Sequence, residues 1–510
     1  MLDFENIDLE CDKTWHLISS GDTKGVFQLE SRLGQTMAKK LKPQNMEQLS
    51  ALISILRPGC LEAVRDGKTV SNHYIDKKNN LESIDYFHNS LEPILKSTYG
   101  EMVYQEQAMQ ICQKVANFNL SEADMVRKAI GKKKPEEMAK IKTLFLQKSK
   151  EAAIVSADEA EQIFSWIEKS QRYSFNKSHA VSYAMNAYVS AFAKAHYPEE
   201  FFTSYLKFSK DKIDPMREVS ELVNNAIANN IKVYRPDLRK LNKDFILDNH
   251  IIYFGLTNIK GIGESVFNKL LNMIQTHNIN LSNININELL LMVLDQINQT
   301  AAKSLISVGG VDYTKVSRKK MLFYLDIVQN LSQREKQIIL EKCNLNDSLD
   351  KILSDLIPFV NKKRAGIISS LILAVKKPAY SLDDDYEWIA NMEKQYLGVS
   401  ITCSVVDGRD LEAANTDCKT LSKSKIIASS IVVGAEIDEV SIVKTKKGKN
   451  PGQEMAFLKI SDGTGACDLV VFPKEYDQYK SILYQHNTIM FSLEKSKNND
   501  SFIIKKCWQI

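Results

Sequence analysis

The chain has 510 residues, 44% of them hydrophobic and 25% charged, and a formal net charge of +4 at pH 7. This length predicts about three or four domains, and the composition is that of an ordinary globular protein whose domains each bury a core. The total charge is too small to indicate a polyanionic partner, so any phosphate binding depends on local basic patches.

The cysteine pattern argues against a small fold held together by zinc or by disulfides. No CxxC pair occurs, so the sequence indicates neither a zinc site nor a disulfide framework, and a reducing cytoplasm is favoured. We find no signal peptide and no apolar run long enough to span a bilayer. The eight cysteines stand singly, at Cys11, Cys60, Cys112, Cys343, Cys403, Cys418, Cys467 and Cys507.

Residues 1 to about 245 have the apolar spacing of three and four that predicts helices. The clearest case is 121–150, where Ser121 and Asp124 suggest a capping box. Three apolar residues then form one stripe, which leaves two cations off the buried face. We expect Gly131 to end this helix and Pro135 to begin the next, so that a basic connection lies between them. The stripe is Ala123, Val126 and Ile130, the cations are Arg127 and Lys128, and the connection is Lys132–Lys134.

A second basic block, residues 171–180, directly precedes a long apolar-periodic helix. Cationic and polar side chains at a helix N-terminus suit a polyanionic ligand, because backbone N–H groups and the helix dipole add to their charge. Local helix capping by Asn176 or Ser178 is the alternative, and it is compatible with binding.

From residue 251 the pattern changes to a short strand, two glycines and another helix. Gly261 and Gly263 flank one apolar residue, which allows close approach of a phosphate to the backbone. This is the pattern of helix–hairpin–helix modules, which grip DNA without reading its sequence. The alternative is a plain helix N-terminal turn. Residues 282–375 are predicted to be helical, without recognisable chemistry.

The last domain begins near Lys425. Strand patterns at 426–442, 454–460, 466–472, 488–494 and 501–508, with a helix at 473–485, predict the order of an OB-fold. Such barrels often bind single strands, although small barrels also serve as protein docking modules. The basic turn 444–452 favours nucleic acid. The fold class is therefore multidomain, mainly α, followed by a small β-barrel of OB type.

With these residues in view, the chain resembles the bacterial DNA polymerase III alpha subunit, a C-family polymerase, over nearly its whole length. The resemblance implies a fingers-like nucleotide-binding domain (1–245), a clamp-associated helix–hairpin–helix domain (246–395), a linker (396–424) and an OB domain (425–510). It rests on Gly25–Ser31, Leu56–Gly59, Thr98–Gly100, Val103–Gln107, Arg127–Pro135, Phe175–His179, the glycine hairpin and Tyr396–Val399.

The resemblance also implies what is missing. In that family the polymerase acids lie on a palm domain, but no Asp-x-Asp pair occurs here in a palm-like context, and Asp3 lies too close to the fingers to be the third acid. No His-x-His cluster of the amino-terminal phosphoesterase domain is present. The chain thus resembles the carboxy-terminal part, as one half of a split polymerase or as a truncation. A phage or mobile element is a conceivable source.

The resemblance assigns partners and site residues. The partners are dNTP, primer–template DNA, a palm-bearing subunit and, as a further candidate, a sliding clamp. Mg²⁺ is expected only in complex with the palm-bearing partner, and this chain is assigned no catalytic or metal-binding residue. A non-enzymatic DNA-binding or assembly protein is the alternative. For the basic residues the alternative interpretation is a solvated basic face, and for Arg57 it is a structural turn. The nucleotide set is Arg57, Arg127, Lys128, Lys132, Lys133, Asn176, Lys177, Ser178 and His179, and the DNA set is Lys260, Gly261, Gly263, Lys444, Lys446, Lys447 and Lys449.

Overall fold

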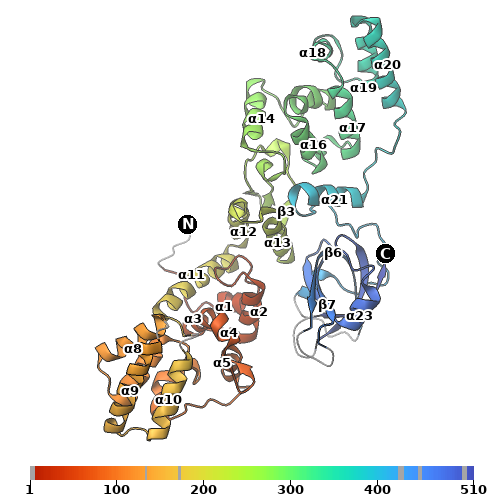
Figure 1. The fold of residues 1–510 in the computed structure, drawn as a ribbon. Helices are drawn as coiled ribbons and strands as arrows, with labels where there is room; N and C mark the ends of the chain where they lie inside the picture. Colours follow the sequence, from red (N-terminus) through yellow and green to blue (C-terminus); the bar gives the residue numbers. More distant parts are fainter. Residues whose placement is uncertain (1–5, 133–134, 171–173, 423–429, 446–450, 497–501) are drawn as a thin grey trace. The chain divides into compact units, whose positions relative to one another are not determined.

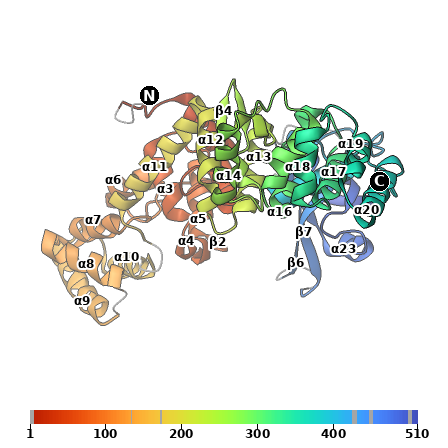
Figure 2. The ribbon, with the colours of Figure 1, turned by 90° about the horizontal axis from the view of Figure 1, so that it is seen from above.

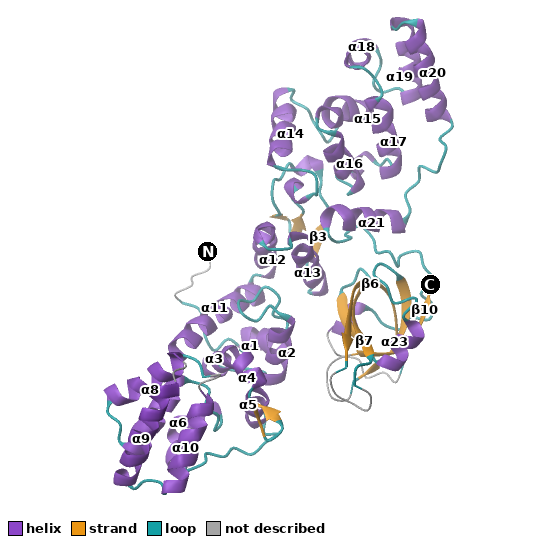
Figure 3. Cartoon of the chain, viewed as in Figure 1, coloured by secondary structure: helices purple, strands orange, loops and turns teal. Residues whose placement is uncertain are grey.

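A computed structural model describes residues 6–132, 135–170, 174–422, 430–445, 451–496 and 502–510 (Figure 1). The chain divides into two compact units, Met1–Phe201 (unit 1) and Phe202–Ile510 (unit 2). Within the described ranges, no helix is long and apolar enough to cross a membrane. Helices dominate both units, and the longest strands belong to the carboxy-terminal barrel (Figure 3).

The first core of unit 1 is built around the long helix α11. Its alanines at 180, 184, 187 and 191 recur at helical spacing and are completely buried, so their small side chains let α11 pack closely on α3. Trp15 and Tyr188 fill the space beside them, with ring centroids 4.8 Å apart. The elements of this core are α1 (Asp12–Ser20), α2 (Arg32–Leu41), α3 (Met46–Ile55), α4 (Pro58–Glu62), β1 (Val64–Arg65), β2 (Lys68–Thr69), α5 (Val70–Lys78) and α11 (Lys177–His196).

The second core of unit 1 is a helical bundle in which α8, α9 and α10 lie side by side (Figures 1 and 2). Phe145 and Phe164 are fully buried at its centre, with ring centroids 5.2 Å apart. The elements of this core are α6 (Glu92–Leu95), α7 (Gln105–Ala116), α8 (Leu120–Lys132), α9 (Pro135–Ala152) and α10 (Ala157–Ser170).

The predicted stripe on α8 is confirmed at Ala123 and Val126, which are both fully buried. The predicted capping box is wrong. Asn119 and Glu122 cap the helix, each accepting a hydrogen bond of 2.9 Å from the other's backbone N–H, and this leaves Asp124 on the helix surface. The predicted end at Gly131 lies one residue from the end of α8 at Lys132. The start of α9 at Pro135 is as predicted.

Unit 2 begins within α12 (Pro198–Phe208), and α13 (Pro215–Ala228) and a small sheet follow before the remaining helices. In the sheet, β3 (Lys232–Tyr234) pairs in parallel with β5 (Ile251–Tyr253), which pairs antiparallel with β4 (Ile246–Asp248). This sheet crosses the predicted domain boundary at residue 245. The division into three domains and a linker remains a prediction. The remaining helices are α14 (Glu264–Thr276), α15 (Ile286–Glu288), α16 (Gln299–Ser307), α17 (Arg318–Gln329), α18 (Gln333–Lys342), α19 (Leu349–Leu356), α20 (Lys362–Lys376), α21 (Tyr386–Leu397) and α22 (Cys418–Ser422).

The carboxy-terminal strands close into a barrel in the order β10-β8-β7-β6-β9, with β10 parallel to β8. This is the OB-type strand order, with α23 between the third and fourth strands, and the predicted fold class is confirmed. Alternate residues of β7, including Leu458 and Ile460, point into the core. The helix is shorter than the predicted 473–485. The elements are β6 (Ile431–Lys444), β7 (Glu454–Ser461), β8 (Ala466–Val471), α23 (Pro473–Tyr479), β9 (Thr488–Lys495) and β10 (Phe502–Gln509).

Candidate nucleic-acid interface

Arg57 meets the segment at the start of α11, although 118 residues separate it from Phe175 in the sequence. Its guanidinium carbon lies 3.7 Å from the centroid of the Phe175 ring. Arg57 precedes Pro58 at the start of α4. Phe175 is held by backbone hydrogen bonds of 3.0 Å to Val103 and from Gln105. The structure therefore brings Arg57 and the predicted residues 176–179 together, and Arg57 is exposed at this place.

The N-terminus of α11 is capped from within the protein. The Asn176 side-chain oxygen accepts hydrogen bonds from the His179 backbone N–H (2.9 Å) and the Ser178 hydroxyl (2.6 Å). The Glu106 carboxylate accepts from the Asn176 amide (2.9 Å) and from the Lys177 backbone N–H (3.0 Å). The backbone N–H groups of Lys177 and His179 are therefore already hydrogen-bonded, so an anion at this helix end would bind mainly to side chains. Glu106 was not predicted, although it lies inside the Val103–Gln107 block.

The side chains of Lys177, Ser178 and His179 remain accessible at this helix end. The Lys177 ammonium lies 3.8 Å from the Glu47 carboxylate, and an exposed pair of this kind is weak enough for a phosphate to displace. The His179 ring carries a hydrogen-bond donor suited to phosphate oxygens. The single Ser178 hydroxyl proton can be donated to phosphate once it leaves the Asn176 oxygen. This end of α11 can therefore present one positive charge and several donors to an anion.

A row of planar groups continues along the same edge of α11; we call it the ring row. The His179 ring lies 5.3 Å from Phe175 and 4.1 Å from Tyr183, measured between centroids. Tyr183 in turn lies 5.2 Å from Phe27, which is 38% exposed. The spacing of four residues between His179 and Tyr183 is the signal that sequence reasoning missed. Planar faces beside cations are suited to stacking with a nucleobase.

Arg127 and Lys128 form a separate group on the second core of unit 1. Both bind one carboxylate: Asp124 lies 2.7 Å from the Arg127 guanidinium and 2.8 Å from the Lys128 ammonium. Hydrogen bonds from Lys128 and Arg127 hold the pKa of Asp124 below its usual value. Lys133 and the side chain of Lys132 lie outside the described residues. The predicted nucleotide set is thus divided into two groups, and this one is neutralised in part by its own helix.

The glycine hairpin lies between the turn Leu256–Asn258 and α14, as predicted. Gly261 has a φ of +97°, and a Cβ there would lie 3.1 Å from the Ser304 hydroxyl. Gly263 precedes the first residue of α14, and a Cβ there would meet nothing within 4 Å. Lys260 is exposed beside them. Glycine at position 261 is therefore required by the local backbone conformation, whereas the space beside the backbone of Gly263 is open to a ligand.

A second glycine turn, Gly309–Gly310, lies between α16 and α17 in a region where we predicted no recognisable chemistry. Gly309 has a φ of +77°, and an added Cβ would collide with Arg318, Arg235 and Asp312. Two glycines between two helices are the signal that could have revealed this turn.

The basic turn of the barrel joins β6 to β7, the first loop position at which OB-folds contact nucleic acid. Lys444 ends β6 and is exposed. Lys446, Lys447 and Lys449 lie outside the described residues. Their assignment to DNA stays a prediction.

In the described part of the chain, no three or more His, Cys, Asp or Glu side chains gather in a way that could hold a metal ion. Asp3 falls outside the described residues.

A mainly helical unit, a glycine hairpin and an OB-type barrel follow one another on this chain. Residues 1–153 match the family described as the bacterial DNA polymerase III alpha subunit finger domain, and residues 230–321 match a helix-hairpin-helix motif.

The chain is 29% identical over 517 residues to the DNA polymerase III subunit alpha of Aquifex aeolicus (strain VF5), and 30% identical over 512 residues to that of Thermus aquaticus. These alignments cover 99% and 98% of this chain but only 39% and 38% of the relatives. The predicted resemblance to the carboxy-terminal part of the DNA polymerase III alpha subunit is confirmed.

Proposed function

We propose that this chain binds the incoming dNTP and the primer–template as the fingers-to-carboxy-terminal portion of a replicative DNA polymerase III alpha subunit. The observation that carries the proposal is the meeting of Arg57 with residues 175–179 at the exposed start of α11. This meeting joins two segments that lie 118 residues apart in the sequence.

The proposed chemistry divides phosphoryl transfer between two partners. Carboxylates of a palm-bearing partner would hold two Mg²⁺ ions, which would supply the Lewis acid that activates the primer hydroxyl and stabilises the leaving pyrophosphate. In this chain Arg57 and Lys177 neutralise the triphosphate, Ser178 and His179 donate hydrogen bonds to its oxygens, and the ring row lies against the base. Arg127 and Lys128 reach the triphosphate after releasing Asp124.

The DNA is proposed to be held at two further places. The open backbone at Gly263, with Lys260, binds duplex phosphates without reading their sequence. The barrel loop with Lys444, Lys446, Lys447 and Lys449 binds the single-stranded template.

Primer extension tests whether the chain needs a palm-bearing partner for DNA synthesis. The purified chain with Mg²⁺ and all four dNTPs is expected to extend no primer, and adding a palm-bearing subunit from the same source is expected to start synthesis. Extension by the chain alone would overturn the division and assign metal carboxylates to this chain. A mixture that binds DNA but never synthesises would favour the non-enzymatic alternative.

The two DNA contacts are separable by substitution in the full chain. Gly263→Val is expected to weaken duplex binding, because its side chain would stand where a phosphate approaches. Replacing the four loop lysines by alanine is expected to weaken single-strand binding instead. A salt titration measures both, since each lost phosphate contact lowers the log–log slope by roughly 0.7 to 0.9.

The matched control for Gly263→Val is Gly366→Val, because a Cβ at Gly366 also meets nothing within 4 Å and neither glycine has a positive φ. The control is expected to bind duplex like the parent. Equal losses on both substrates from either change, or none, would reassign the carboxy-terminal half to protein docking.

A further inference from the structure

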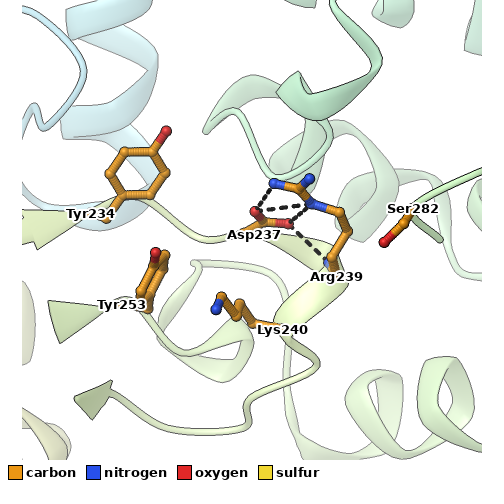
Figure 4. A pocket seen from close by; sticks show the side chains of 6 residues that line it. All are labelled: Tyr234, Asp237, Arg239, Lys240, Tyr253 and Ser282. Carbon is orange, nitrogen blue, oxygen red and sulfur yellow. Dashed lines mark hydrogen bonds and ion pairs between the residues drawn. The ribbon is translucent and has the colours of Figure 1, made fainter. Parts of the chain in front are cut away.

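Unit 2 has an open pocket of about 390 Å³ on the edge of its small sheet (Figure 4). We call it the tyrosine pocket. Its volume falls within the range of about 300–1,000 Å³ that small-molecule sites occupy. The residues that line it are Tyr234, Asp237, Arg239, Lys240, Tyr253 and Ser282.

Two tyrosines stand side by side on one face of this sheet. Tyr234 and Tyr253 are register partners on the parallel strands β3 and β5, and their ring centroids lie 5.5 Å apart with planes 60° to one another. Tyr234 is 40% exposed. Cations back both rings, with the Arg235 guanidinium and the Lys240 ammonium each 4.7 Å from a ring centroid. These contacts keep the aromatic surface ordered at the mouth of the pocket.

The cations around the tyrosine pocket are paired with carboxylates. Lys240 lies 2.5 Å from Asp248, and Arg239 lies 2.6 Å from Asp237. Arg235 lies 2.9 Å from Asp312. The charges nearly balance, so the pocket is poorly suited to a free polyanion. It favours a neutral planar group that carries both donors and acceptors, which is the chemistry of a nucleobase.

The tyrosine pocket is also continuous with the glycine hairpin. Tyr253 ends β5, eight residues before Gly261. Lys243, on the same connection as Lys240, forms an ion pair of 2.5 Å with Glu264, the first residue of α14. One compact segment therefore carries an open backbone for a phosphate and an aromatic surface for a base.

We propose that the tyrosine pocket takes one unpaired base of a single-stranded nucleic acid, stacked on Tyr234 and hydrogen-bonded by Lys240, Asp237 and Ser282. This inference rests on the proposed DNA-binding function and adds a base-holding subsite to it. Base–aromatic stacking tolerates any sequence, so the subsite holds strand without reading it.

Photo-crosslinking of the full chain to a single-stranded oligonucleotide containing 5-iodouracil tests the placement without any substitution. Crosslinked peptides are expected to include Tyr234 or Tyr253. In a binding titration, Tyr234→Ala is expected to weaken single-strand affinity by about fivefold to a hundredfold, with little effect on duplex. Tyr234→Phe keeps the ring and is expected to bind like the parent, as is Tyr380→Ala, which removes an exposed tyrosine elsewhere in the unit.

Crosslinks confined to the barrel, or Tyr234→Ala binding single strands like the parent, would overturn the tyrosine pocket as a base site while the DNA-binding function stood. A parent chain that binds no single strand would overturn both.

Discussion

Arg318→Ala is expected to lower the free energy of unfolding of unit 2 by about 3–5 kcal/mol, because it leaves the buried Glu393 carboxylate without its cation. Arg318 is 2% exposed at the start of α17. Its guanidinium lies 2.9 Å from the Glu393 carboxylate, which is fully buried, and 3.0 Å from that of Asp312. It also donates to the Ser307 carbonyl oxygen at 3.0 Å.

Urea unfolding followed by circular dichroism measures this loss. The control is Lys303→Ala, which removes an exposed pair, since Lys303 and Asp326 are 37% and 49% exposed. Its expected cost is below about 1 kcal/mol. An Arg318→Ala loss as small as that of the control would mean that water reaches Glu393 and that the buried network adds little. Because Arg318 also packs against Gly309, the second glycine turn is expected to loosen in the same variant.

In a polymerase restored with a palm-bearing partner, the double variant Arg127→Ala, Lys128→Ala is expected to lower kcat/KM for the nucleotide by roughly a hundredfold or more. Each charge-assisted contact to phosphate is worth about 1.5–3 kcal/mol, and every 1.4 kcal/mol changes the constant tenfold. Steady-state kinetics with one varied dNTP measures the loss. Lys140→Ala, which removes an exposed charge from the neighbouring α9, is the control and is expected to behave like the parent.

Asp124→Asn gives the opposite expectation. Its carboxylate holds both cations in the absence of ligand, so a triphosphate must compete with it. Removing its charge is expected to lower KM for the nucleotide severalfold. Unchanged kinetics in both the double variant and Asp124→Asn would show that the 127–134 block is a solvated face with no role in nucleotide binding.

The barrel shows how much of a β-domain can be predicted from the local pattern of apolar and turn residues. All five strands were predicted from short apolar runs and from the turn residues between them, and β7 buries every second residue. The error at the start of α8 arose because two capping patterns lie within a few residues of each other. Asn119 and Glu122 form the capping pair of α8 that was assigned to Ser121 and Asp124.

The helices, the strands, the family resemblance and the basic blocks could all be predicted, because periodicity and motifs depend on residues close together in the chain. Which charges are available for a ligand depends on contacts between distant segments. The tertiary structure places Glu106 on the start of α11, stacks Arg57 on Phe175, and buries Arg318 against Glu393. These partners lie 71, 118 and 75 residues apart. Their meeting depends on how whole helices pack, and no local pattern encodes that packing.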